Sequence, residues 1–66
     1  MRYLTVTSFG SFLGLSGQCL VVKQNGEVFR EIALSHLRGI NIAKSGVSIS
    51  SDLVQACAIR GIKIFF

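Results

Sequence analysis

The chain has 66 residues, of which 50% are hydrophobic and 15% are charged, and its formal net charge is +4. This composition excludes a disordered segment, which combines low hydrophobicity with many charges, and the length excludes more than one small domain. A domain of this size buries only about 60% of its unfolded surface, so a mean hydropathy of +0.58 predicts a subunit of an assembly or a piece of a longer polypeptide.

The N-terminal part of the chain predicts two short strands. Residues 3–7 alternate between polar and apolar side chains, which is typical of a half-buried strand. A turn over residues 8–10 leads to a second strand over residues 12–15. Gly14 lies within that strand, where a glycine fits a bulge or the close approach of a neighbour.

The clearest local signal is Asn25-Gly26, which lies between two β-rich runs. Both central positions of a type I′ turn need positive φ, which Asn tolerates and Gly adopts freely, so a β-hairpin is expected over residues 18–34. A two-residue turn also fixes the register. The expected pairs are Gln24 with Glu27, Lys23 with Val28, Val22 with Phe29, Val21 with Arg30 and Cys19 with Ile32.

Neither face of this hairpin is cleanly polar. One face carries Cys19, Val21, Val28, Ile32 and Leu34, and the other carries Leu20, Val22 and Phe29. A solvated antiparallel hairpin alternates apolar and polar residues. We therefore expect this hairpin to be covered on both faces for at least half of its length.

Two further strands are expected after the hairpin. A bend at Ser35-His36 precedes a strand over residues 37–43, and Ser45-Gly46 turns the chain into a short strand over residues 47–50. These elements lack proline and show no linker or repeat, which favours one compact domain.

The period of the pattern then changes to that of a helix. Residues 50–52 each fit an N-cap, Leu53 and Cys57 are four positions apart on one face, and Gly61 fits the residue that ends the helix. A final strand covers residues 62–66. The predicted fold is mainly β with one short helix, in the α+β class, arranged as a small antiparallel β-sandwich.

The sequence offers few groups for catalysis. It has one histidine, His36, and three carboxylates, Glu27, Glu31 and Asp52. General acid–base chemistry and metal-dependent phosphoryl chemistry need several such groups in one place. We therefore expect no catalytic, cofactor-binding or metal-ligating residue in this chain. Serines near the helix start, at positions 45, 48, 50 and 51, fit either capping or an anion site, and capping is favoured.

The cations are spread singly along the chain. They fit either solvated charges that discourage strand aggregation or a weakly basic surface for a polyanion, and the candidates for DNA-proximal cations are Lys23, Arg30 and Lys44. No apolar run approaches the roughly 18 to 20 residues of a membrane span, so no membrane partner is expected. Cys19 and Cys57 lack metal-ligand spacing and are expected to be buried free thiols in a reducing cytoplasm.

Five segments in this order resemble a known family. They are CLVV at 19–22, NGE at 25–27, EIALSHL at 31–37, VSIS at 47–50 and RGIKIF at 60–65. The ordered set is similar to the N-terminal β domain of the CRISPR-associated integrase, the nuclease/integrase subunit that inserts new spacers into a CRISPR array. The resemblance covers nearly the whole chain.

The resemblance implies that the full protein has two domains with different roles. Residues 1–66 would be the N-terminal β domain, truncated in or after its last strand. The absent C-terminal helical domain would bind Mg or Mn and carry the DNA endonuclease and integrase activity. The β domain would then be a non-catalytic structural and dimerisation domain in CRISPR adaptive immunity, working in the cytoplasm with a small ferredoxin-like partner subunit and DNA.

The apolar residues left over by this arrangement are expected to mediate self-association into a homodimer. They are Leu20, Val22 and Phe29 on the hairpin and Ile64, Phe65 and Phe66 in the last strand. Two alternatives remain open, namely a free-standing small β-barrel that binds nucleic acid directly and a module that binds only protein. Salt-dependent DNA binding separates the first alternative from the structural role.

Overall fold

The structure is a computed structural model, and it describes the backbone of residues 2–66 and the side chains from residue 3 onward. The elements are β1 (Arg2–Val6), β2 (Phe12–Ser16), β3 (Cys19–Gln24), β4 (Glu27–Ala33), the 3-10 turn η1 (Leu34–His36), β5 (Leu37–Ile42), β6 (Ser48–Ile49), α1 (Ser51–Arg60) and β7 (Lys63–Phe65).

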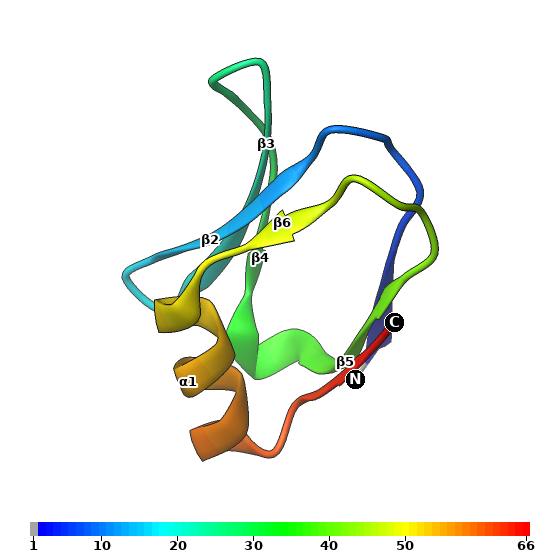
Figure 1. Cartoon of the computed structure of the whole chain (residues 1–66). Helices are drawn as coiled ribbons and strands as arrows, with labels where there is room; N and C mark the ends of the chain where they lie inside the picture. The colour runs from blue at the N-terminus through cyan, green and yellow to red at the C-terminus, as the bar shows by residue number, and fades with distance from the viewer. Residues whose placement is uncertain (1) are drawn as a thin grey trace.

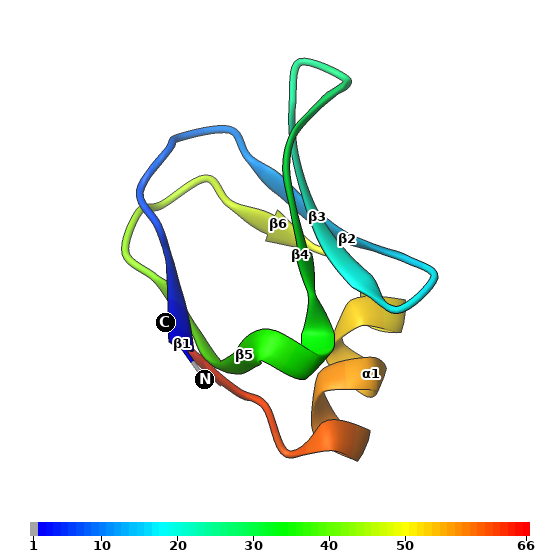
Figure 2. The ribbon, with the colours of Figure 1, turned by 180° about the vertical axis from the view of Figure 1, so that it is seen from behind.

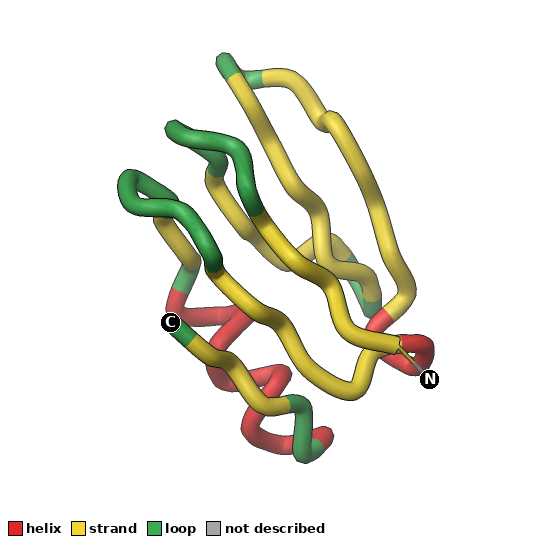
Figure 3. The backbone as a smooth tube through the Cα atoms, turned by 90° about the vertical axis from the view of Figure 1, so that its right-hand side faces the viewer, coloured by secondary structure: helices red, strands yellow, loops and turns green. Residues whose placement is uncertain are grey.

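The strands form two sheets that pack face to face. One sheet has the strand order β1-β5-β7, and the other has the order β4-β3-β2-β6. Figure 3 shows the two layers from the side. The helix α1 runs from β6 in one sheet to β7 in the other and lies against β2 and β7 (Figure 1). The predicted class, a mainly β sandwich with one helix, is confirmed.

A single apolar core fills the space between the sheets and the helix. Leu13 and Leu20 from one sheet, Ile40 from the other and Leu53 from α1 are all fully buried. Their strands and helix supply one apolar face each, and the core joins these faces. Burial of side chains of this size stabilises the fold by about 1.5–3 kcal/mol each.

The strand directions differ from the antiparallel arrangement expected. The sheet β1-β5-β7 is parallel throughout, and β6 pairs in parallel with β2. Parallel neighbours need long crossover connections. Here β2, β3 and β4 separate β1 from β5, and β6 with α1 separates β5 from β7. Alternation along a strand identifies its two faces but not its direction, so the sequence pattern carried no signal for this feature.

The hairpin turn is confirmed, but its register is only partly as expected. Asn25 and Gly26 have φ of 53° and 79°, and the two predicted pairs nearest the turn are present. Beyond them β4 contains a β-bulge at Phe29. The remaining pairs shift by one residue and become Val22 with Arg30, Val21 with Glu31, Leu20 with Ile32 and Cys19 with Ala33, so the predicted pairs Val22–Phe29, Val21–Arg30 and Cys19–Ile32 are wrong.

The bulge has a physical reason in the burial of Ile32. In the uninterrupted register Ile32 would lie on the opposite face from Leu20, whereas the extra residue brings it to the same face. Both side chains are then buried in the core. The sandwich therefore gains an apolar residue in β4 by giving up one regular pair at an edge strand.

The outer face of the hairpin is covered in part by the chain itself. Val21 is buried on this face, beside Gly14 in the neighbouring strand β2. A Cβ at Gly14 would lie 3.0 Å from Phe12 Cε2 and 3.6 Å from Val21 Cγ2, so the glycine leaves room for the Phe12 ring beside Val21. The predicted close neighbour of Gly14 is thus Phe12.

The helix has the ends that the sequence predicts. The Ser50 hydroxyl oxygen accepts a hydrogen bond from the Leu53 amide at 3.2 Å, and Asp52 lies in the first turn. Gly61 has φ of 73°, and the Ile62 amide donates to the Cys57 carbonyl at 2.8 Å. Within the described part of the chain, no helix is long and apolar enough to cross a membrane.

The core and the hairpin edge are expected to differ sharply in their response to truncation. Leu20→Ala removes atoms from a fully buried site and should lower the free energy of unfolding by about 2–5 kcal/mol. Phe29→Ala removes a larger side chain that is 68% exposed and should change it by less than about 0.5 kcal/mol. Urea unfolding followed by circular dichroism measures both, and equal losses would contradict the bulged register.

Candidate interaction surfaces

The titratable groups are dispersed over the surface. Glu27 lies at the hairpin turn, Glu31 on the outer face of β4, His36 at the end of η1, and Asp52 in the first turn of α1, and all four are exposed. Within the described residues no group of three or more His, Cys, Asp or Glu is arranged to hold a metal ion. The residues present therefore do not fit a divalent metal.

The structure divides the six residues expected to mediate self-association. Leu20 and Val22 are buried in the core of this chain, because the inner face of the hairpin faces the other sheet. The expectation that they form a free surface is therefore wrong. Phe29 is exposed, and Ile64 is half-buried against the core. Phe65 is 45% exposed and Phe66 is 91% exposed.

The exposed members of that set lie on opposite sides of the sandwich. Phe29 belongs to β4, at one edge of the four-stranded sheet, while Phe65 and Phe66 are in and beyond β7, at an edge of the other sheet. The helix α1 lies against the β7 side, whereas β4 faces β1 across the other side. Phe29 and the phenylalanines of β7 therefore form two separate surfaces.

The three candidate DNA-proximal cations do not converge. Lys23 pairs with Val28 on the outer face of the hairpin, while Arg30 pairs with Val22, whose side chain faces the core. Lys44 lies in the loop between β5 and β6. All three side chains are exposed, but their positions on different faces do not form one basic stripe.

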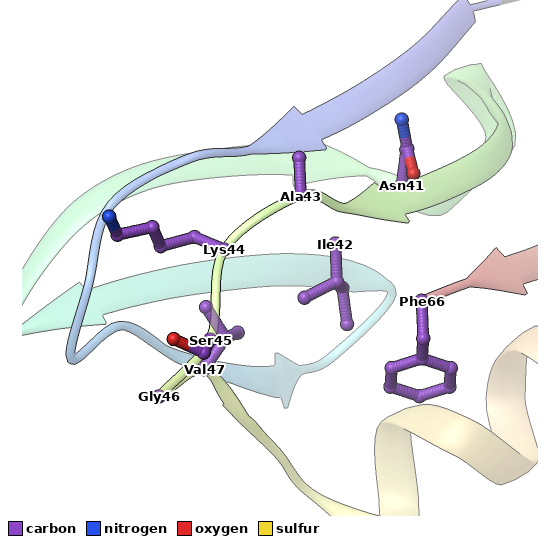
Figure 4. Close-up of a pocket in the computed structure, with 8 residues that line it drawn as sticks. All are labelled: Asn41, Ile42, Ala43, Lys44, Ser45, Gly46, Val47 and Phe66. Carbon is purple, nitrogen blue, oxygen red and sulfur yellow. The ribbon is translucent and has the colours of Figure 1, made fainter.

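A shallow groove lies beside the C-terminal end of β7. It has a volume of about 540 Å³ and is lined by the β5–β6 loop and Phe66. Figure 4 shows Ile42 between Phe66 on one side and Val47 on the other, with the Lys44 amino group extending away from Phe66. The groove is consequently apolar at its centre.

A second hollow, with a volume of about 250 Å³, lies between the edges of β1 and β4. Leu4, Val6 and Val22 supply its apolar part, and Phe29 and Arg30 line it from β4. The β3–β4 hairpin that carries these two residues projects beyond the rest of the molecule (Figures 1 and 2).

Sequence reasoning missed several exposed apolar side chains, among them Phe9, Ile59 and Val28. Phe9 is 71% exposed, and its ring lies over Gly46 from another loop. No rule for single turns pairs these two loops. Ile59 is exposed on α1. It does not share the helix face of Leu53 and Cys57, so the helical period could have predicted its exposure. Val28 is exposed beside the hairpin turn, opposite Lys23 as predicted, although its face was expected to be covered.

The two cysteines are free thiols, as expected. Cys57 is buried among core residues, while Cys19 is only half-buried at the start of β3. Burial raises the pKa of the Cys57 thiol above its ordinary value, because the thiolate loses hydration in the core.

Comparison with known proteins gives these surfaces a family context. The family model described as CRISPR associated protein Cas1 matches residues 4–66. The chain belongs to the Cas1 family. It is 46% identical over 66 residues to CRISPR-associated endonuclease Cas1 1 of Francisella tularensis subsp. novicida (strain U112), covering 100% of this chain and 20% of that protein. The chain thus spans about a fifth of the length of this curated relative.

A solved structure shares the fold at low sequence identity. A chain of a partial Cas6-RT-Cas1–Cas2 complex superposes with a TM-score of 0.76 over 83% of this chain and 16% of its own length, at 14% identity. This likeness shows the fold. Together with the Cas1 family match, it confirms the resemblance to the CRISPR-associated integrase family drawn from the ordered segments.

The two thiols are expected to differ in reactivity. At a pH near 8, iodoacetamide should alkylate Cys19 at least about tenfold faster than Cys57 in the folded protein, because the raised pKa and the burial of Cys57 both lower its reactive thiolate. Mass spectrometry of timed samples measures both rates. A Cys19→Ser variant is the control: it should be labelled quickly only in urea, and rapid labelling without urea would contradict the packing of Cys57.

Proposed function

We propose that this chain is a non-catalytic structural and dimerisation domain of a Cas1 integrase that acquires spacers in CRISPR adaptive immunity. The proposal rests on the match of the Cas1 family model to residues 4–66. The chain spans only about a fifth of its curated relative, so most of the whole protein lies outside it. The dispersed positions of His36 and the three carboxylates support a role other than catalysis.

The chemistry of the whole protein is assigned to the part of its relatives that this chain does not span. There a divalent metal, Mg or Mn, would support DNA cleavage and strand transfer. The described residues of this chain supply no ligand set for it.

The partners proposed for the whole protein are a second copy, a Cas2-type subunit with a ferredoxin-like fold, and DNA, with assembly in the cytoplasm. The structural neighbour comes from a complex that contains Cas1 and Cas2, which supports the second of these partners. Exposed apolar side chains on two sides of a domain of 66 residues support protein contacts in general.

Self-association is assigned to the surface around β7. Phe65 and Phe66 are adjacent and exposed, and Ile64 lies between them and the core. The strand β7 is an edge strand of three residues, so its outer backbone groups face away from the sheet. An edge strand flanked by exposed aromatic side chains offers both backbone hydrogen bonds and apolar area to a second copy.

A charge introduced at this surface should weaken self-association. Phe66→Glu should raise the dimer dissociation constant at least about tenfold, because a carboxylate would have to be desolvated at the contact. Sedimentation equilibrium measures the constant, and Ile59→Glu, which alters another exposed apolar residue on α1, is the matched control. Unchanged association of Phe66→Glu, or an equal loss in both variants, would contradict the assignment to β7.

The alternative function, direct binding of duplex DNA through a basic surface, predicts a steep salt dependence. Each phosphate contact contributes a slope of about −0.9 in log K against log salt. Because Lys23, Arg30 and Lys44 lie on different faces, we expect at most one contact and a slope no steeper than about −1. Fluorescence anisotropy with a labelled duplex measures the slope, and a value near −3 would favour the alternative.

A further inference from the structure

The parallel sheet β1-β5-β7 has a bare outer face. The chain passes from β1 to β5 through β2, β3 and β4, and from β5 to β7 through β6 and α1. These strands belong to the other sheet, which packs on the inner face, and α1 lies against β2 and β7. In Figure 3 the outer face is turned toward the viewer, and no other described element lies in front of it.

This arrangement is unusual for a parallel sheet. Such sheets are normally covered on both faces, because their crossover connections place helices there. Here both crossovers lie on the inner side of the sheet. The fold of these residues therefore provides no cover for the outer face.

The outer face presents two rows of residues in register across its three strands. The rows are Tyr3, Gly39 and Lys63, and next to them Thr5, Asn41 and Phe65. Tyr3 is 57% exposed and Phe65 is 45% exposed. A Cβ at Gly39 would lie 2.6 Å from Tyr3 Cε2, so the tyrosine ring lies across the middle strand. The two rings thus offer apolar area on both sides of β5.

The charge on this face has one sign. Lys63 is exposed in the first row, and Arg38, the extra residue of a β-bulge at the start of β5, is exposed next to Gly39. The three carboxylate side chains of the sequence lie elsewhere, two on the β3–β4 hairpin and one in α1. An acidic partner would therefore meet two cations and no acidic side chain.

The dimensions of the face match one α-helix. Neighbouring strands are about 4.8 Å apart, so β1 and β7 are separated by about 10 Å, which is close to the diameter of a helix with its side chains. The middle strand β5 has six residues. It is about 20 Å long at about 3.3 Å per residue, which corresponds to about 13 residues of helix.

We propose that the outer face of β1-β5-β7 binds an acidic amphipathic helix of a partner protein. Apolar side chains of that helix pack on Tyr3 and Phe65, and carboxylates beside its apolar stripe pair with Lys63 and Arg38. Helices are the elements that cover parallel sheets in other folds. The proposal goes beyond the structural and dimerisation role and does not depend on it.

A second copy of this chain fits the face poorly. Its helix α1 already packs Leu53 and Cys57 into the core, and it carries only one acidic and one basic residue. A symmetric contact between two such faces would bring Lys63 and Arg38 of one copy near the same cations of the other. Duplex DNA would pair with the cations, but its phosphates offer no apolar partner to the Phe65 ring.

The test is a titration of the isotope-labelled chain, followed by amide NMR. The probe is a helical peptide of about 14 residues with leucines along one face and glutamates on both sides of it. We expect a dissociation constant of about 100 μM or below and shifts in the amides of Thr5, Asn41, Lys63 and Phe65. A control peptide with glutamine in place of every glutamate should bind about 3- to 30-fold more weakly, because it loses two exposed ion pairs.

Two matched pairs of variants isolate the face. Thr5→Glu places a carboxylate in the middle of the face and should weaken binding of the acidic peptide at least about tenfold. Ser16→Glu makes the equivalent change at an exposed position of the other sheet and should have no effect. Lys63→Gln should weaken binding by about 2- to 5-fold and reduce its salt dependence, whereas Lys23→Gln on the hairpin should do neither.

Several results would overturn the proposal. They are no binding of the acidic peptide by a chain whose spectrum shows a folded protein, equal affinity for the glutamine peptide, and equal losses in Thr5→Glu and Ser16→Glu. Tighter binding of a duplex DNA probe than of the peptide at the same amides would also contradict it.

Other occupants of the face give distinct signatures. Shifts of the same amides on raising the concentration of the chain alone would assign the face to a second copy, against the proposal. Peptide binding by residues 1–66 that is lost in a longer Cas1 polypeptide carrying them would assign the face to that polypeptide, and this too would overturn it. Sedimentation of Phe66→Glu without peptide tests self-association through β7 separately.

Discussion

The structure depends on one apolar core shared by both sheets and the helix. Leu13, Leu20, Ile40 and Leu53 come from four separate elements and are all fully buried. Each of the two sheets turns an apolar face toward this core. A domain of 66 residues has little surplus stability, so each buried apolar residue matters. The bulge in β4 adds Ile32 to this core, and it also determines where Phe29 points.

The sequence predicted features that depend on local chemistry. The turn at Asn25-Gly26 needs positive φ, and the helix needs a cap at one end and Gly61 at the other, so these elements were predicted nearly to the residue. Strand direction and the bulge depend on which strands meet across the whole chain. Alternation within one strand carries no information on either, which is why the parallel sheet and the shifted register were missed.

The candidate surfaces show the same difference between features set by local sequence and features set by contacts between distant strands. Phe65 and Phe66 were predicted as exposed from the end of an apolar strand, and they are exposed. Leu20 and Val22 were assigned to a surface because one face of the hairpin was expected to be left over, whereas that face packs into the core and Val21 on the outer face is buried as well. The hollow at Phe29 and Arg30 was not predictable, because β1 and β4 are far apart in sequence and in different sheets.

The parallel sheet also determines the geometry of attachment. Tyr3 and Lys63 flank Gly39, whereas Thr5 and Phe65 flank Asn41 farther along the same parallel strands. The start of β1 and the end of β7 therefore lie at opposite ends of this sheet, as Figure 3 shows. A polypeptide joined after Phe66 would leave beside the β5–β6 loop, at the end of the sheet opposite to the start of β1.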